Sequence, residues 1–148
     1  MSEVRFYHLL RQSVERALPA LLGKALETGK RIVVKTSDAR RAEFLNDALW
    51  TQDAQSFLPH GSAKDGHAAD QPVWITDQDD VPNGAKIMIC VDGADVAAPA
   101  DFDLCCHVFD GNSDQAVQEA RAKWKVLSDQ GIDMTYWQQT DQGWQKKA

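Results

Sequence analysis

The stretch RIVVKTSDARRAEFLNDALW, residues 31–50, sets the fold class because it reads as a buried strand followed directly by an amphipathic helix. Residues 31–35 centre on a continuous apolar run, which is typical of a strand buried on both faces of a parallel sheet. Ser37 or Asp38 can cap a helix that then extends through Trp50. The inward side of that helix carries apolar residues at helical spacing: Ala42, Leu45 and Leu49. The stretch therefore predicts one strand–helix unit of an α/β domain.

The sequence on either side repeats this alternation. Residues 4–10 predict a first strand, and a helix follows that either kinks at Pro19 or starts near Leu18, with Gly29 closing it. Further strands are expected at residues 71–76, 85–90, 104–109 and 134–139, with the clearest helix over 113–131. Residues 61–70 are expected to form a flexible polar insert, and residues 143–148 a tail. We predict a single domain, residues 1–148, with a Rossmann-like three-layer α/β fold whose mostly parallel sheet carries helices on both faces.

Composition excludes several classes of protein. Of the 148 residues, 43% are hydrophobic and 26% are charged, which is ordinary for a globular domain. No apolar run approaches the roughly 20 residues of a membrane span. The N-terminus does not have the layout of a signal peptide, so a cytoplasmic protein without membrane contact is expected. The three cysteines are expected to be buried, reduced thiols, and their spacing predicts no metal site.

Charge and motifs both argue against a nucleotide or nucleic-acid site. A net charge of −6 would repel a phosphate backbone, so DNA is expected to be only an indirect partner. The turn after the first strand, HLLRQSVERA at residues 8–17, contains no glycine with which to cradle a phosphate. His8 and His107 lie in strand patterns, where a structural role is expected. The sequence thus predicts no catalytic residue and no cofactor.

An enzyme remains an alternative. Such an α/β enzyme would act on a nucleotide or a phosphorylated metabolite in a crevice at the carboxyl ends of the strands. A convergent cluster of acids or histidines at that edge would favour this alternative. A flat edge, with a basic and aromatic notch on the last long helix, would favour an adaptor.

Two groups of residues predict contacts with other proteins. The first is apolar and surrounds a polar loop: Trp50, Phe57, Leu58, Pro59 and His60. These side chains either cover the core or are presented to a partner. The second lies on the helix over 113–131, where Trp124 belongs to an inward stripe and Arg121 and Lys125 flank it. Two cations beside an aromatic edge suit an acidic peptide with an apolar side chain, although a buried tryptophan with basic neighbours would give the same pattern.

Eight segments occur in an order that resembles a known family. They are FYHL, GKRIVV, LNDALWTQDAQSFLPHG, QPVWI, PNGA, VFDGN, ARAKWKVLSDQG and TYWQQTDQGWQKKA. Together they resemble the chi subunit of bacterial DNA polymerase III holoenzyme, an accessory protein of the clamp loader, over essentially the whole chain. The resemblance implies a non-catalytic adaptor with a nucleotide-binding-like fold but no nucleotide site.

The resemblance also implies two partners and the residues that bind them. The psi subunit of the clamp loader, or a helicase at the same surface, would contact Trp50, Phe57, Leu58, Pro59 and His60. The acidic C-terminal tail of single-stranded-DNA-binding protein (SSB), which ends in phenylalanine, would bind Arg121, Trp124, Lys125 and Tyr136. The resemblance makes Tyr136, on the strand that follows the helix, a candidate for a wall of the tail pocket. The resemblance assigns no role to Trp144.

Overall fold

A computed structural model describes residues 3–51, 60–62, 66–79, 81–96 and 99–148. Within that part of the chain the helices are α1 (Val14–Leu26), α2 (Ala39–Thr51) and α3 (Asp114–Asp129), with 3-10 turns η1 (Ala68–Asp70) and η2 (Pro99–Asp101). The strands are β1 (Glu3–Leu9), β2 (Ile32–Lys35), β3 (His60–Ser62), β4 (Val73–Thr76), β5 (Ile87–Cys90), β6 (Leu104–Asp110), β7 (Met134–Thr140) and β8 (Gly143–Lys146).

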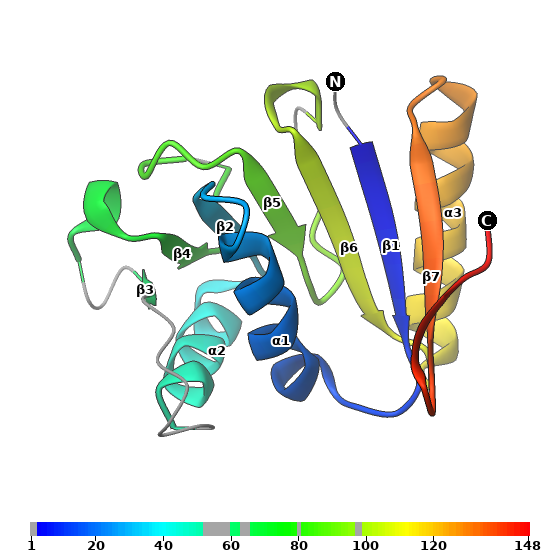
Figure 1. The fold of residues 1–148 in the computed structure, drawn as a ribbon, viewed down its shortest axis with the longest axis horizontal. Helices are drawn as coiled ribbons and strands as arrows, with labels where there is room; N and C mark the ends of the chain where they lie inside the picture. The colour runs from blue at the N-terminus through cyan, green and yellow to red at the C-terminus, as the bar shows by residue number, and fades with distance from the viewer. Residues whose placement is uncertain (1–2, 52–59, 63–65, 80, 97–98) are drawn as a thin grey trace.

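The eight described strands form one sheet in the order β3-β4-β2-β5-β6-β1-β7-β8 (Figure 1). Neighbouring strands are parallel except for β7 and β8, which form an antiparallel hairpin. The first strand of the chain lies between two strands from near its other end, so that Phe6 is in register with both His107 and Tyr136. The predicted three-layer α/β fold with a mostly parallel sheet is confirmed.

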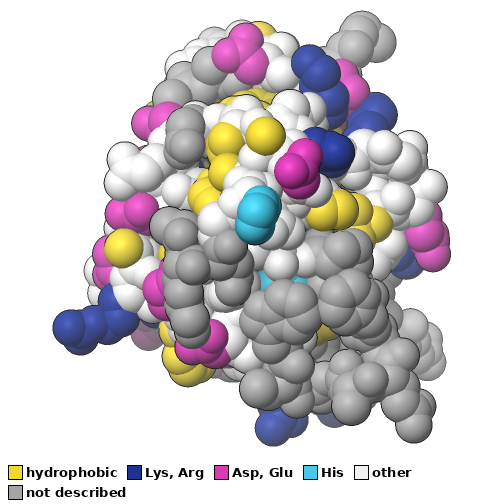
Figure 2. All heavy atoms as spheres, turned by 90° about the vertical axis from the view of Figure 1, so that its left-hand side faces the viewer, with side chains coloured by type: hydrophobic (Ala, Val, Ile, Leu, Met, Phe, Trp, Pro, Cys, Tyr) yellow, Lys and Arg dark blue, Asp and Glu magenta, His cyan; other side chains and the backbone are white. Residues whose placement is uncertain are grey.

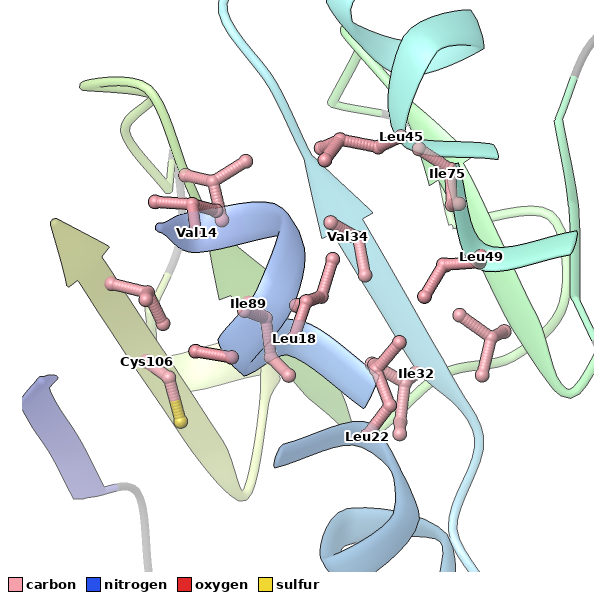
Figure 3. Packing of buried hydrophobic residues seen from close by; sticks show 14 of the residues in the cluster. Val14, Leu18, Leu22, Ile32, Val34, Leu45, Leu49, Ile75, Ile89 and Cys106 are labelled. Carbon is pink, nitrogen blue, oxygen red and sulfur yellow. The ribbon is translucent and has the colours of Figure 1, made fainter. Parts of the chain in front are cut away.

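Helices cover the two faces of the sheet and divide its apolar side chains into two cores. α1 and α2 pack on one face, where Leu18, Leu22 and Leu45 meet the aliphatic side chains of β2, β4 and β5 (Figure 3). α3 packs on the opposite face, over a second cluster that includes Phe6 and Phe109. Both faces of β2 are buried, as its apolar sequence predicts.

The structure corrects three expectations about local structure. The expected tail at residues 143–148 instead supplies strand β8, because its backbone completes an antiparallel ladder with β7. The expected polar insert contributes to β3 at its start and forms η1 at its end. β3 forms because its backbone pairs with β4, which offsets the weak strand propensity of its residues. Pro19 lies inside α1, which begins at Val14, so a helix start near Leu18 is wrong.

The carboxyl edge of the sheet is the place where connections diverge. The chain leaves β1 toward α1 on one face and leaves β6 toward α3 on the other, although β1 and β6 are neighbours. Such a switch point is where ligands bind in open α/β sheets. Among the described residues, no helix combines the length and the hydropathy that crossing a membrane would require.

Candidate protein-interaction surfaces

Helix α3 positions the cations and the tryptophan of the predicted tail site. The Ser113 hydroxyl accepts a hydrogen bond from the backbone N–H of Ala116 at 3.2 Å and so caps the helix start. Gly131, with a φ of +74°, turns the chain after the helix end. The apolar stripe of α3 packs against the second core, as predicted, through Val117, Ala120, Trp124 and Leu127.

Arg121 and Lys125 are exposed on α3 and are one helical turn apart. Neither has an ion-pair partner among the described residues. Lys123, on the same helix, is different: its ammonium group lies 3.1 Å from the Asp95 carboxylate and donates to the backbone carbonyl of Gly93 at 2.8 Å. Arg121 and Lys125 therefore keep their full charge available to a ligand, whereas Lys123 is held by the protein itself.

An aromatic cluster lies beside these two cations. Trp124 packs edge-on against Phe6, with ring centroids 5.4 Å apart, and edge-on against Tyr136 at 5.8 Å. Trp124 and Tyr136 are both only partly buried, so their outer edges reach the surface. We call Arg121, Trp124, Lys125 and Tyr136 the basic–aromatic surface. The structure brings together four residues that the sequence analysis placed on two separate elements.

His8 is a residue of this neighbourhood that the sequence analysis assigned only a structural role. Its Nδ1 lies 2.6 Å from the Tyr136 hydroxyl, and the two rings meet edge to face at 5.8 Å. Burial lowers the pKa of His8, a hydrogen bond with the backbone of Gly111 opposes that shift, and the nearby Arg121 charge adds to it. Burial raises the pKa of Tyr136. A neutral His8 ring can therefore fix the Tyr136 hydroxyl at the rim of the basic–aromatic surface.

Gly111 permits this arrangement because nothing larger fits at its position. A Cβ on Gly111 would lie 2.0 Å from Cδ2 and 2.2 Å from Nε2 of His8, and 2.5 Å from the carbonyl oxygen of Leu9. The backbone N–H of Gly111 also donates to that carbonyl at 2.6 Å. The sequence signals this contact only by having a glycine directly after β6. That the glycine lies next to His8 follows from the register between β1 and β6, which the sequence pattern does not give.

The second predicted surface is described only in part. Phe57, Leu58 and Pro59 lie outside the described residues, and so does the side chain of Trp50, whose backbone belongs to α2. His60 is described: it is 3% exposed, and its Nε2 lies 3.2 Å from the backbone oxygen of Asn46 in α2. The His60 ring thus anchors the start of β3 to α2. On the face at this edge of the sheet, apolar side chains and both signs of charge are interspersed (Figure 2).

The carboxyl edge, where an enzyme of this fold would bind its substrate, carries an acidic cavity. It has a volume of about 320 Å³, and its lining includes Asp92, Asp110 and Glu119 but no histidine, lysine or arginine. Arg41 pairs with the Asp92 carboxylate, but Asp110 and Glu119 have no ion-pair partner among the described residues and would repel a phosphate, so this cavity does not suit the nucleotide or phosphorylated metabolite of the enzyme alternative. No group of three or more His, Cys, Asp or Glu residues in the described part of the chain could hold a metal ion.

The three cysteines are buried free thiols, as predicted. Burial raises the pKa of Cys90 and of Cys105 to about 12 and raises that of Cys106 as well. Thiolates are the reactive form of cysteine, so these residues contribute packing rather than chemistry.

Comparisons with known proteins agree on one family. A family model described as "DNA polymerase III chi subunit, HolC" matches residues 1–135. The chain is 33% identical over 97 residues to the "Probable DNA polymerase III subunit chi" of Rickettsia prowazekii, covering 66% of this chain and 59% of that protein. It is also 33% identical over 63 residues to the "DNA polymerase III subunit chi" of Escherichia coli, covering 43% of each chain. The aligned segments thus span about half the length of these relatives. The chain belongs to the DNA polymerase III chi subunit family.

Proposed function

We propose that this chain is a non-catalytic adaptor of the DNA polymerase III holoenzyme that links the clamp loader to single-stranded DNA coated by SSB. In this proposal the acidic C-terminal tail of SSB binds the basic–aromatic surface. The psi subunit binds the surface that contains Trp50, Phe57, Leu58 and Pro59, with His60 holding its end in place. Contact with DNA is indirect because the net charge of −6 opposes a phosphate backbone.

The main observation behind the tail proposal is that two cationic side chains beside an aromatic cluster have no ion-pair partner among the described residues. Arg121 and Lys125 are exposed and unpaired within the described part of an acidic chain, and they flank the partly buried rings of Trp124 and Tyr136. Carboxylates of a peptide can pair with the two cations while a phenylalanine ring packs on the aromatic edges. An acidic tail that ends in phenylalanine supplies both groups.

Binding at this surface should be modest and sensitive to salt. Each exposed ion pair contributes about 0–1 kcal/mol, so the aromatic contact must supply much of the affinity and most of the specificity. The Debye length shortens from about 10 Å at 0.1 M salt to about 3 Å at 1 M, so raised salt should weaken the complex without abolishing it.

Titration with a synthetic peptide tests the tail proposal directly. The peptide is acidic and ends in Pro-Phe, it carries a fluorophore at its N-terminus, and binding is followed by anisotropy. Arg121→Ala should weaken binding by about fivefold, the upper range for one exposed ion pair. Removing the terminal phenylalanine from the peptide should weaken binding by about tenfold or more.

Lys123→Ala is the matched control because it removes the same charge from the same helix at a residue already held by Asp95 and Gly93. It should leave tail affinity unchanged. If Lys123→Ala weakens binding as much as Arg121→Ala does, the peptide responds only to overall charge and the proposed site is wrong. Affinity that rises with salt would also contradict the electrostatic account.

The psi proposal needs a separate experiment on the other surface. Leu58→Glu should prevent co-elution with purified psi subunit on a sizing column while leaving tail binding intact. Arg121→Ala should weaken tail binding while leaving co-elution with the psi subunit intact. Tail binding without any psi binding would indicate that another protein, such as a helicase, uses the surface around residue 58.

A further inference from the structure

A groove lies on the face of the sheet opposite the basic–aromatic surface. It runs between α1 and the β7–β8 hairpin and has a volume of about 280 Å³. Tyr7, Cys106 and Val108 form its floor, Leu21 and Lys24 form one wall, and Trp144 forms the other. We call it the α1–β8 groove. It includes Trp144, to which neither the sequence nor the proposed function gives a role.

The groove exists because no helix in the described part of the chain covers this half of the sheet. Figure 1 shows α1 and α2 over the half that holds β2, β4 and β5, whereas the other described helix, α3, lies behind β1 and β7. Parallel strands are usually covered by helices on both faces. Here Tyr7 and Leu104 remain only partly buried on the open side, and the ring of Trp144 packs edge-on against that of Tyr7 at 5.0 Å. The open face is therefore apolar and incompletely covered.

The dimensions of the open face match one helix. Neighbouring strands lie about 4.8 Å apart, so β6, β1 and β7 together present a strip about 10 Å wide. An α-helix with its side chains has a diameter of about 10–12 Å, and packed helices lie about 8–10 Å apart. A helix placed beside α1 would lie over β1 and complete the layer that α1 and α2 begin.

The charged side chains around the groove are basic and therefore favour a helix with acidic side chains. The residues that line the groove include Arg5 and Lys24 but no aspartate or glutamate. Arg5 is already bonded to Glu3 at 2.9 Å, whereas Lys24 has no ion-pair partner among the described residues. Lys146 on β8 lies opposite Trp137 and, by strand alternation, on the same face as Trp144; the described residues give it no partner either. Lys24 thus lines the groove on the α1 side, and Lys146 lies on the β8 side, two residues beyond Trp144.

One further polar group belongs to a residue that lines the groove. The Nε1–H of Trp137 donates to the Thr135 hydroxyl at 2.9 Å, but no described residue accepts from the Nε1–H of Trp144. A carboxylate of a bound helix would satisfy that donor as well as the lysines. The carboxyl-edge cavity, in contrast, is lined by carboxylates and offers an acidic partner no such complement.

We propose that the α1–β8 groove binds an amphipathic helix of a partner protein, with acidic side chains flanking its apolar stripe. Large apolar side chains of the helix enter the groove beside Tyr7 and Trp144. Glutamates or aspartates on its two flanks pair with Lys24 on α1 and Lys146 on β8. The site lies on a different face from the basic–aromatic surface, so it can be occupied while the tail is bound.

Nuclear magnetic resonance of the full chain tests this proposal through the indole N–H signals. The probe is a synthetic peptide of about 18 residues, long enough to form a helix, with blocked ends, leucine and phenylalanine on one stripe and glutamates on both flanks. A scrambled peptide of identical composition, without the stripe, is its control. The indole signal of Trp144, assigned with Trp144→Phe, should shift with the amphipathic peptide and not with the scrambled one.

Variants on the groove separate a specific site from general attraction. Lys24→Glu should weaken peptide binding by about fivefold or more, because it replaces an attraction by a repulsion. Arg16→Glu is the matched control: it makes the same charge change at an exposed position of the same helix, away from the groove, and should leave affinity unchanged. Both sites are exposed, so neither variant depends on tolerance of the core.

Several results would overturn the proposal. They are a Trp144 signal that stays fixed at millimolar peptide, equal shifts with both peptides, or a shift at Trp124 in its place. A Trp144 shift that appears with protein concentration alone would show that a second copy occupies the groove. A shift with a single-stranded oligothymidine would assign the groove to nucleic acid instead. Loss of tail binding at the basic–aromatic surface would leave the groove proposal untouched.

Discussion

Replacing Gly111 with alanine should destabilise the protein through a steric clash that can be worked out from the structure. The added Cβ would lie 2.0 Å from Cδ2 of His8, whereas such carbon contacts are most favourable at about 3.5–4.0 Å. The ring could rotate away, but the Leu9 carbonyl oxygen at 2.5 Å belongs to the backbone of β1 and cannot. The chain must therefore shift at the carboxyl edge of the sheet.

The expected cost combines two contributions. Overpacking of this kind costs about 1–3 kcal/mol, and loss of the hydrogen bond between His8 and Tyr136 adds about 1 kcal/mol. A total of about 3 kcal/mol would lower the melting temperature of a domain of this size by about 10 °C. Because Tyr136 would lose its fixed position, binding of the tail peptide should also weaken in the folded variant.

Urea and thermal unfolding followed by circular dichroism measure this effect. Gly23→Ala is the matched control because a Cβ there meets nothing within 4 Å inside α1. That variant should be stabilised by about 0.5–1 kcal/mol, since alanine favours helix. A Gly111→Ala protein that unfolds within about 0.5 kcal/mol of the unmodified chain would refute the reasoning.

Three further outcomes are expected. Cys90 and Cys105, buried and with pKa values raised to about 12, should resist a thiol reagent at pH 8 until the protein is unfolded, as a colour assay would show. Burial lowers the pKa of His107 to about 4, so between pH 6.5 and 4 the unfolded chain binds the extra proton. As the pH falls through this range, the free energy of unfolding should therefore decrease by up to about 1.4 kcal/mol per pH unit. His107→Gln should make this decrease smaller, as urea titrations at several pH values would show. Arg41 pairs with Asp92 at 2.8 and 3.2 Å, so Arg41→Ala should cost about 1 kcal/mol in the same assay.

The sequence predicted elements whose signal is local and missed those that depend on pairing. The central parallel strands carry continuous apolar runs, and α3 carries both caps and a clear stripe, so each could be identified alone. β3 has the sequence His-Gly-Ser, and β8 has a single apolar residue, Trp144. Both are strands because a neighbour supplies hydrogen bonds, which a single-sequence pattern does not report.

The candidate site likewise contains residues that the sequence could place and contacts that it could not. Arg121, Trp124 and Lys125 share one helix, so helical spacing alone is enough to place them side by side. His8 reaches Tyr136 only because β1 and β7 are parallel neighbours in a particular register. The role of Gly111 is set by its distance to a side chain on another strand. Contacts of this kind follow from topology, which is fixed by the whole chain.

The position of β1 has a consequence for synthesis. β1 has both of its neighbours only once β7 has been made, because Phe6 lies in register with Tyr136. At about 5–20 residues per second, a ribosome takes on the order of ten seconds to translate the residues between these two. Strand β1 thus gains its second neighbour only after β7 has been translated, although it precedes the other described strands in the chain. Until then the edge of β1 that β7 will occupy is open to other polypeptides, including a chaperone that binds nascent chains, beside Val4, Phe6 and Leu9, which the folded protein buries completely.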